Sequence, residues 1–242
     1  ADLVSEGQAG PLRRLEDLPT FPFDHPAYIL FSSGTTGRPK CIVHGAGGTL
    51  FEHVKEHRLH SDLRPGEKLF FQTAAGWMMW NWLVSALASR VTVVLYEGSV
   101  THPSPDALWQ LVAREGVNVF GTSPGYLQFT REAEIVPASL DLSRLRAIQS
   151  TGSVLSDDLF QWVKDKVKAI PVQSISGGTD IVGCFLLGNP NLPVYSGELQ
   201  AKSLGYDVDA FGADGKPVAL GEIGELVCKR PFPSRPVGLF GD

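Results

Sequence analysis

The sequence predicts an α/β protein with a doubly wound, mostly parallel sheet that ends in a β-rich segment. Two observations support this fold class. Short apolar runs alternate with segments of helical periodicity along most of the chain, and this alternation is typical of βαβ units with right-handed crossovers. Hydrophobic residues make up 43% of the 242 residues, which is enough to build a buried core around such a sheet.

The first part of the chain predicts a polar loop between two buried strands. Residues 1–26 carry Gly, Pro and mixed charges and are typical of a loop-like lead-in. Apolar runs at residues 27–31 and 41–43 predict the two strands. A helix is expected at residues 49–59, with Leu50, Phe51 and Val54 facing inward.

The middle of the chain supplies the other strands and helices. One expected helix has both ends marked: Ser104 is an N-cap candidate, Pro105 suits the first helical position, and Gly116 suits a C-terminal stop. Ser156 likewise predicts the start of a helix that runs to residue 167. The remaining expected strands are residues 68–72, 91–96, 117–120, 145–149 and 172–175, and further helices are expected at residues 80–89 and from about residue 125.

The last part of the chain changes to β structure. Residues 207–211 and 221–229 predict strands, and Asp214-Gly215 is a tight-turn signal between them. We therefore expect three regions: the lead-in at residues 1–26, an α/β region at residues 27–203, and the start of a β-rich subdomain at residues 204–242.

The loop between the first two strands concentrates hydroxyls, glycines and cationic side chains. Glycines let the backbone turn several N–H groups toward one anion, and the hydroxyls and Lys40 add donors and charge. A Walker A loop does not fit these residues. A phosphate-binding loop and an ordinary polar connection both remain open from composition alone. The loop comprises Ser32, Ser33, Gly34, Thr35, Thr36, Gly37, Arg38, Pro39 and Lys40.

The order of residues in this loop resembles the phosphate-loop signature of the adenylate-forming enzymes, the family of acyl-CoA synthetases, luciferases and peptide-synthetase adenylation domains. Two further segments also resemble the family, namely Ser-Gly-Gly-Thr-Asp at residues 176–180 and Gly-Glu-Ile-Gly-Glu-Leu at residues 221–226. We assign the latter to structure, because its glycines and alternating apolar positions explain it without a ligand. The resemblance spans residues 28–239.

The resemblance implies a role for each of these loops. Residues 32–40, with Lys40 as a catalytic cation, would hold the β- and γ-phosphates of ATP. The loop of Gly152, Ser153 and Val154 would lie against adenine, although it is also an ordinary strand-to-helix turn. Gly178 and Thr179 would meet the α-phosphate, and Asp180 would bind Mg²⁺, which prefers hard oxygen ligands.

Two departures from the family pattern bear on these roles. Asp180 is one methylene shorter than the glutamate of the family, so Mg²⁺ could be bound directly or through a bridging water. Ser176 replaces an aromatic residue that would stack on adenine, which leaves base stacking open.

An aromatic run at residues 76–82 suggests an acyl pocket. Core packing is the ordinary explanation for clustered tryptophans, but a Gly-Trp at a strand end can also form the wall of a ligand site. The run resembles the acetoacetyl-CoA synthetases, one branch of the family. In acetate-activating relatives a tryptophan matches Gly177, so glycine implies room for a longer acid such as acetoacetate. The expected pocket residues are Gly76, Trp77, Met78, Trp80 and Gly177.

The implied reaction is that of an acid–thiol ligase. A small carboxylic acid would attack the α-phosphorus of ATP to give an acyl adenylate, and coenzyme A would then take the acyl group. The family's ribose-binding aspartate and its small C-terminal catalytic domain with the adenylation lysine are not expected within these residues. We therefore expect the intact parent to be active and this chain alone to be inactive.

Two alternatives belong to other functional classes. His53-x-x-Glu56-His57 fits the inverted zinc-peptidase motif, in which two histidines one helical turn apart hold zinc. His60, Lys55 and Arg58 instead suggest that this helix face is simply solvated. A non-catalytic nucleotide-binding remnant is the second alternative.

Charge and cysteine content restrict the partners and the compartment. A net charge of −5 argues against a nucleic-acid surface, and no apolar run approaches the roughly 18 residues that a membrane span requires. Cys41, Cys184 and Cys228 are far apart and odd in number, which favours reduced thiols in a cytoplasmic protein. The sequence leaves the oligomeric state open.

Overall fold

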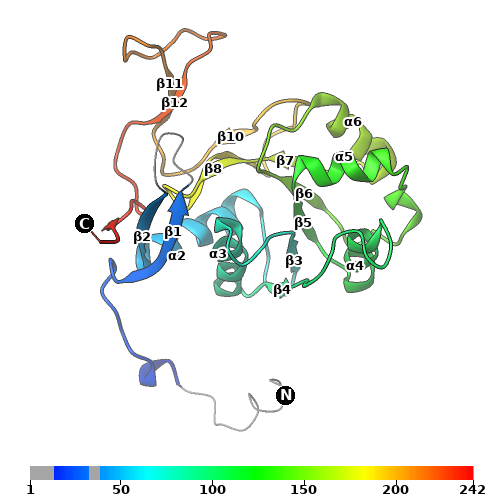
Figure 1. Cartoon of the computed structure of the whole chain (residues 1–242), viewed down its shortest axis with the longest axis horizontal. Coiled ribbons are helices and arrows are strands. Elements are labelled where there is room, and N and C mark those ends of the chain that lie inside the picture. Colours follow the sequence, from blue (N-terminus) through cyan, green and yellow to red (C-terminus); the bar gives the residue numbers. More distant parts are fainter. Residues whose placement is uncertain (1–13, 33–38, 242) are drawn as a thin grey trace.

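A five-stranded parallel sheet forms the centre of the molecule. The structure is a computed structural model that describes residues 14–32 and 39–241. The strands follow the spatial order β4-β3-β5-β6-β7, and Figure 1 shows them between two groups of helices. This arrangement confirms the predicted α/β class. The strands are β3 (Lys68–Phe71), β4 (Thr92–Val94), β5 (Val119–Thr122), β6 (Ala147–Ser150) and β7 (Val172–Ser174).

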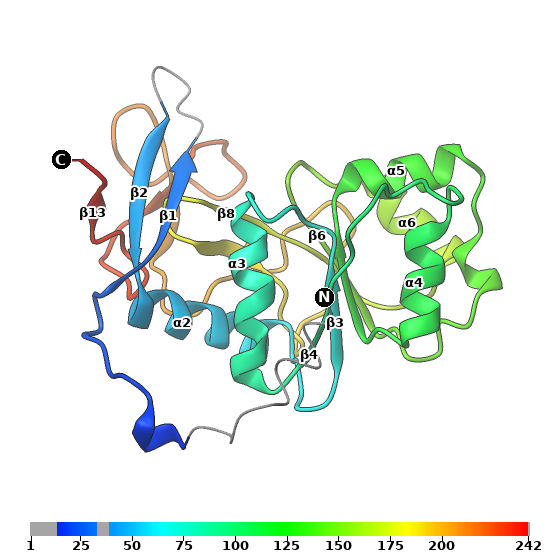
Figure 2. The same ribbon diagram turned by 60° about the horizontal axis from the view of Figure 1, so that its bottom comes forward.

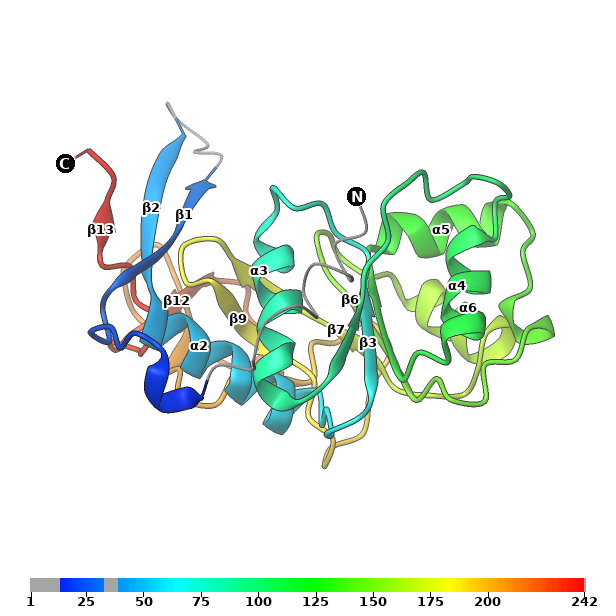
Figure 3. The same ribbon diagram turned by 90° about the horizontal axis from the view of Figure 1, so that it is seen from below.

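Helices cover both faces of this sheet, as a doubly wound fold requires. Figures 2 and 3 show α4, α5 and α6 on one face and α2 and α3 on the other. Shorter helical segments are Leu15–Asp17, Ala86–Ser89 and Pro137–Ser139, and a π-helical turn, Glu56–His60, follows α2. The α-helices are α2 (Ala46–Lys55), α3 (Met78–Ser85), α4 (Ala107–Glu115), α5 (Pro124–Glu132) and α6 (Asp157–Lys166).

Aromatic packing dominates the core beneath α4 and α5. The rings of Phe70 and Phe120, which pair across β3 and β5, stack with centroids 5.4 Å apart. Trp109 of α4 meets Phe120 edge-on at 5.1 Å, and its buried indole N–H donates to Thr130 at 3.1 Å. Large apolar strand residues thus explain why the short runs of the sequence form fully buried strands.

The helix ends follow the sequence signals in part. Gly116 ends α4 with a φ of 62°, the left-handed conformation that glycine adopts without steric cost. The start of α4 differs from the prediction, since Asp106 and not Ser104 is the N-cap. The Ser104 hydroxyl donates to Asp106 at 2.5 Å and so supports the cap without forming it.

We expect the two serine caps to differ in strength. Ser123 caps α5 and accepts a hydrogen bond from the Tyr126 N–H at 3.1 Å, whereas Ser156 precedes α6 without such a bond. Ser123→Ala should therefore lower the free energy of unfolding by about 1 kcal/mol, and Ser156→Ala by clearly less. Denaturant titration of both variants tests this, and equal losses would contradict the assignment of the caps.

Three smaller antiparallel sheets surround the parallel one. The order β1-β2-β13 places β13, near residue 239, beside β2, and β11 and β12 form the hairpin expected near the end (Figure 1). Gly215, with a φ of 74°, provides the predicted turn between them. The division of the chain at residues 26/27 and 203/204 stays a prediction. The strands are β1 (Pro26–Ser32), β2 (Lys40–Gly45), β8 (Ser176–Gly178), β9 (Gly183–Leu187), β10 (Ala201–Lys202), β11 (Val208–Phe211), β12 (Glu225–Cys228) and β13 (Gly238–Leu239).

Two predictions about buried faces were wrong. The strand β1 is not buried, since 69% of Phe31 is exposed. In α2 the expected inward residues Leu50 and Phe51 are exposed, while Glu52 and His53 are buried. The polar side of the helix lies inward, because His53 bonds to Ser85 of α3 and to the Val182 carbonyl just before β9. Glu56, in the π-helical turn that follows, bonds to Trp82 of α3 and Cys184 of β9.

Candidate functional site

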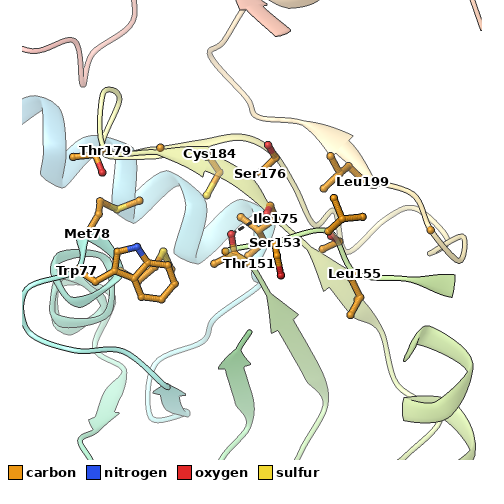
Figure 4. A pocket seen from close by; sticks show the side chains of 17 residues that line it. Trp77, Met78, Thr151, Ser153, Leu155, Ile175, Ser176, Thr179, Cys184 and Leu199 are labelled. Carbon is orange, nitrogen blue, oxygen red and sulfur yellow. Dashed lines mark hydrogen bonds between the residues drawn. The ribbon is translucent and has the colours of Figure 1, made fainter. Parts of the chain in front are cut away.

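A cavity of about 510 Å³ opens beyond the carboxyl ends of β6 and β7. Ligands of doubly wound sheets gather at such edges. Figure 4 shows Trp77 and Met78 on one side of the cavity, Thr151 and Ser153 on the other, and Cys184 and Ser176 above them in this view. The lining residues are Trp77, Met78, Met79, Thr151, Gly152, Ser153, Val154, Leu155, Ser174, Ile175, Ser176, Gly177, Gly178, Thr179, Cys184, Gly197 and Leu199.

The loop between β6 and α6 lays its backbone along the cavity. Thr151 donates its hydroxyl to the Ile175 carbonyl at 2.9 Å, which ties this loop to the segment after β7. Gly152 has a φ of 98°, a conformation that β-carbon-bearing residues rarely adopt. Val154 is 90% exposed and, like Gly152 and Ser153, lines the cavity. The predicted adenine loop therefore borders the cavity.

Trp77 faces this loop from the start of α3. A β-carbon at Gly152 would lie 3.8 Å from the indole ring of Trp77, so the expected nucleotide loop and the expected acyl pocket adjoin. Met78 also lines the cavity. Gly76 and Trp80, which the sequence placed in the same pocket, are not among its lining residues.

Gly177 borders the cavity, and the structure gives a reason for glycine at this position that the sequence does not reveal. It pairs with Cys184 across β8 and β9. A β-carbon at Gly177 would overlap the carbonyl oxygen of Gly183 and lie 2.9 Å from the Cys184 Cα. The interpretation that glycine here simply leaves the space of an indole is therefore corrected, since a side chain at this position would run into the β9 backbone.

Thr179 and Asp180 follow β8 and are joined to the strand after the predicted phosphate loop. The buried His44 of β2 donates its Nε2 proton to the Thr179 carbonyl at 2.8 Å. Burial lowers the pKa of His44, which favours the neutral imidazole that makes this bond. Lys40, four positions before His44, is exposed and pairs with Ser32 across β1 and β2. The predicted phosphate-loop residues Ser33, Gly34, Thr35, Thr36, Gly37 and Arg38 lie outside the described residues.

The donor set suits Mg²⁺ bound together with phosphate oxygens. The Asp180 carboxylate is exposed, and within the described part of the chain no salt bridge engages it. Mg²⁺ commonly uses one or two protein carboxylates and takes its other ligands from substrate phosphates and water. A lone, available carboxylate beside Thr179 fits that requirement.

The zinc-peptidase alternative is contradicted by the surroundings of its residues. The His53 Nε2 donates to the Val182 carbonyl at 2.6 Å, and its Nδ1 lies 2.8 Å from the Ser85 hydroxyl. The Glu56 carboxyl accepts bonds from Trp82 and Cys184. Among residues 14–32 and 39–241, no group of three or more His, Cys, Asp or Glu side chains is arranged to hold a metal ion. The solvated-face reading is also wrong, because His53, Glu56, His57 and His60 are buried.

These buried histidines make stability depend on pH. Burial lowers the pKa of His53 to about 4 from 6.5, and also lowers those of His44, His57 and His60. The unfolded chain therefore binds more protons than the folded one in this range, and stability falls as the pH drops from about 6.5 toward 4. Glu56 acts in the opposite sense, because burial and the charge of Glu52 raise its pKa.

We expect His53 alone to remove about 1 kcal/mol of stability between pH 6.5 and 5.5. Denaturant unfolding across this range should show a net loss, because four histidines outnumber the one opposing carboxyl group. His53→Gln should reduce the dependence of the free energy of unfolding on pH by the contribution of this one histidine. A stability that is constant or rises as the pH falls through this range would contradict the assignment.

Sequence reasoning missed several residues of the site. Leu155 and Leu199 line the cavity without any motif to mark them, and Cys184, for which no role in the site was expected, lines it as well. Met79, which also lines it, belongs to the aromatic run at residues 76–82 but was not among the expected pocket residues. His44 could have been suspected only from its position shortly after the phosphate loop. The roles of the predicted site residues stay predictions.

Comparison with known proteins identifies the family. The family model described as AMP-binding enzyme matches residues 4–235. The chain belongs to the AMP-binding enzyme family. This membership confirms the resemblance found in the loops at residues 32–40 and 176–180.

Individual members of the AMP-binding family match almost the whole chain. An acetoacetyl-coenzyme A synthetase of Rhizobium meliloti is 54% identical over 246 residues, which cover 100% of this chain and 37% of that protein. An acetoacetyl-CoA synthetase of Gallus gallus is 46% identical over 241 residues, covering 99% of this chain and 36% of that protein. The chain thus spans little more than a third of the length of these relatives.

A solved structure agrees with the fold. The acetoacetyl-CoA synthetase from Streptomyces lividans superposes with a TM-score of 0.87 at 47% identity, over 92% of this chain and 35% of that one. Within the described ranges, none of the helices is both long and apolar enough to pass through a bilayer.

Proposed function

We propose that this chain forms the nucleotide and acyl site of an acid–thiol ligase that activates acetoacetate with ATP and transfers it to coenzyme A. The proposal rests mainly on one observation: segments that each resemble a family motif line the same cavity. The Gly152–Val154 loop, the Gly177–Thr179 segment and the Trp77-Met78 pair come from distant parts of the chain and all line it. Relatives that match the whole chain carry acetoacetyl-CoA synthetase names.

The residues divide into those that bind nucleotide and those that bind the acid. Adenine lies against the backbone of Gly152, Ser153 and Val154, where the glycine conformation keeps side chains out of the way. The Thr179 hydroxyl donates to an α-phosphate oxygen, beside Gly178, whose β-carbon position is open. Lys40, at the end of the loop that begins at Ser32, supplies positive charge to the outgoing pyrophosphate.

Asp180 is the residue that would hold Mg²⁺. When bound, Mg²⁺ neutralises phosphate charge and stabilises the leaving pyrophosphate. The bond from His44 to the Thr179 carbonyl fixes the backbone next to Asp180, whose exposed side chain is not among the residues that line the cavity. A hydroxyl and a carboxylate on consecutive residues serve the α-phosphate and the metal together.

The acyl group lies between Trp77, Met78 and the β8–β9 strands. Apolar contacts from Met78 and Met79 suit the terminal methyl of a four-carbon acid, and the flexible thioether side chain adapts to irregular space. The cavity of about 510 Å³ has room for such an acid beside a nucleotide. Attack by its carboxylate on the α-phosphorus gives the acyl adenylate, and the coenzyme A thiol then displaces AMP.

Acetoacetate-dependent ATP–pyrophosphate exchange tests the proposal. The protein that carries this chain should exchange label only with acetoacetate or a close 3-oxo acid, and should form the thioester on addition of coenzyme A. Exchange with another acid but not with acetoacetate would contradict the substrate. Nucleotide binding without exchange for any acid would instead support the nucleotide-binding remnant.

The cellular compartment follows as part of the same proposal. Cys41, Cys184 and Cys228 are all free thiols, which is ordinary for a protein kept in the reducing cytoplasm. The substrates, a small acid, ATP and coenzyme A, are water-soluble and require neither nucleic acid nor membrane.

A further inference from the structure

The buried polar face of α2 and the π-helical turn after it lies directly behind the cavity wall. Glu52, His53, Glu56 and His57 are each at most 1% exposed. Polar side chains are buried at a cost unless partners satisfy them, so the bonds of this face show what it holds in place. The zinc motif of the sequence falls on this face, and neither zinc nor the roles proposed above account for it.

Glu56 binds both elements that carry the cavity wall. One carboxyl oxygen accepts the indole N–H of Trp82, in α3, at 2.7 Å. The other accepts the backbone N–H of Cys184, in β9, at 2.7 Å, and the Cys184 thiol lies 3.4 Å from the carboxyl group. Trp82 is one helical turn from Met78, and both Met78 and Cys184 line the cavity.

His53 holds the turn that joins β8 to β9. Its Nε2 bonds to the Val182 carbonyl at 2.6 Å. Val182 has a φ of 48°, which is strained for a β-branched residue and persists only where neighbouring structure fixes it. This turn, residues 179–182, contains Thr179 and Asp180, so His53 and Glu56 together fix the hairpin that carries the proposed phosphate and metal residues.

A second row of charges closes the polar cluster behind Glu56. Glu52 pairs with Lys55 at 2.7 Å, and Lys55 also donates to Ser203 at 2.7 Å and lies 4.7 Å from the Tyr206 ring centroid. Burial raises the pKa of Glu56, and the neighbouring Glu52 charge raises it further. Lys55 thus has hydrogen-bond partners in Glu52 and Ser203, while Glu56 itself is held by its bonds to Trp82 and Cys184.

We propose that Glu56 is a positioning residue of the acyl pocket, setting the separation between the start of α3 and the β8–β9 hairpin by bonding Trp82 and Cys184 at once. This inference rests on the proposed function of the cavity as the acyl site. A side chain that only stabilised the fold would change the amount of active protein, whereas a positioning residue changes the affinity for the acid.

Two variants cut the link at different points. Glu56→Gln leaves a single acceptor oxygen, so the amide cannot accept both N–H groups. Trp82→Phe removes only the indole donor and keeps an aromatic ring in the core. Trp109→Phe is the matched control, because Trp109 is equally buried and also loses an indole bond, but packs under α4, away from the cavity.

Steady-state kinetics of the protein that carries this chain provide the first test. Glu56→Gln and Trp82→Phe should raise the KM for acetoacetate on the order of tenfold while the KM for ATP stays within about twofold. The double variant should resemble the stronger single variant, because both break the same link from α3 through Glu56 to β9. Unchanged KM with reduced kcat in both, as in Trp109→Phe, would overturn the inference.

Labelling of Cys184 gives a readout that needs no activity. In the unaltered protein Cys184 is 1% exposed, and iodoacetamide should modify it slowly relative to the half-buried Cys41. Both variants should speed Cys184 labelling on the order of tenfold through local loosening of β9, and Trp109→Phe should not. Equal labelling in all four proteins would overturn the positioning role. Absence of acetoacetate-dependent exchange in the unaltered protein would instead refute the proposed function, whatever the labelling shows.

Discussion

Asp180→Asn is expected to lower ATP–pyrophosphate exchange by about 100-fold in the protein that carries this chain. The substitution keeps the shape of the side chain and removes the charge that attracts Mg²⁺. Because Asp180 is exposed, the fold should be unaffected. Exchange rates measured over a range of Mg²⁺ concentrations, with thermal unfolding in parallel, test this expectation.

Two comparisons sharpen this prediction. Asp165→Asn changes an exposed carboxylate on α6 whose only side-chain partner in the described part of the chain is Gln161, and it should leave exchange unchanged. Lys40→Ala should reduce exchange less than Asp180→Asn, since backbone donors share the phosphates with Lys40. If Asp180→Asn matches the unaltered protein at limiting Mg²⁺, Asp180 is not the metal ligand.

Gly177→Ala is expected to destabilise the protein by about 3 kcal/mol, at the upper end of overpacking effects. Its β-carbon would overlap the Gly183 carbonyl oxygen and press on the Cys184 Cα at 2.9 Å. Backbone atoms cannot move aside as a flexible side chain does, so β8 and β9 must separate. Activity toward every acid should fall together.

The neighbouring glycine is the control. Apart from its two chain neighbours, the nearest atom of the described residues to a β-carbon at Gly178 would be the Asp180 backbone nitrogen at 4.0 Å, so Gly178→Ala should change the free energy of unfolding little. Denaturant unfolding of the two variants measures the difference. If Gly177→Ala is as stable as Gly178→Ala and only shifts the preference toward shorter acids, the β9 backbone does not exclude a side chain at position 177. The earlier interpretation, that glycine deepens the acyl pocket, would then be correct.

Much of the fold could be predicted from the sequence, because local signals suffice for its central sheet. Short apolar runs gave β3, β5 and β6 within two or three residues of their observed ends. The rule that ligands gather at the carboxyl ends of parallel strands then pointed to the loop at residues 151–154 before its geometry was known.

The orientation of α2 could not be predicted in this way. Leu50 and Phe51 were expected inward because periodicity marks an apolar stripe but not what lies opposite it. The polar stripe is buried because Glu56 finds Trp82 26 positions away and Cys184 128 positions away. Such partners are visible only once the chain has folded.

The role of Gly177 shows the same limit within the site. The sequence shows only that position 177 lacks a bulky side chain. Two explanations, a deeper acyl pocket and a close approach of the neighbouring backbone, both require glycine there. The position of β9 distinguishes the two explanations. Its pairing with β8 shifts register between Ser176 and Gly177, and no local sequence pattern predicts this shift.

A crystal structure of the protein that carries this chain with a non-hydrolysable acetoacetyl-adenylate analogue tests the central claim most directly. Adenine should lie on the backbone of Gly152–Val154, the phosphate-mimicking group beside Thr179, and the acyl group between Met78 and the β8–β9 hairpin. Binding of the analogue instead in the separate cavity of about 410 Å³ that Phe70, Tyr96 and Ser123 help to line, with the first cavity empty, would contradict it.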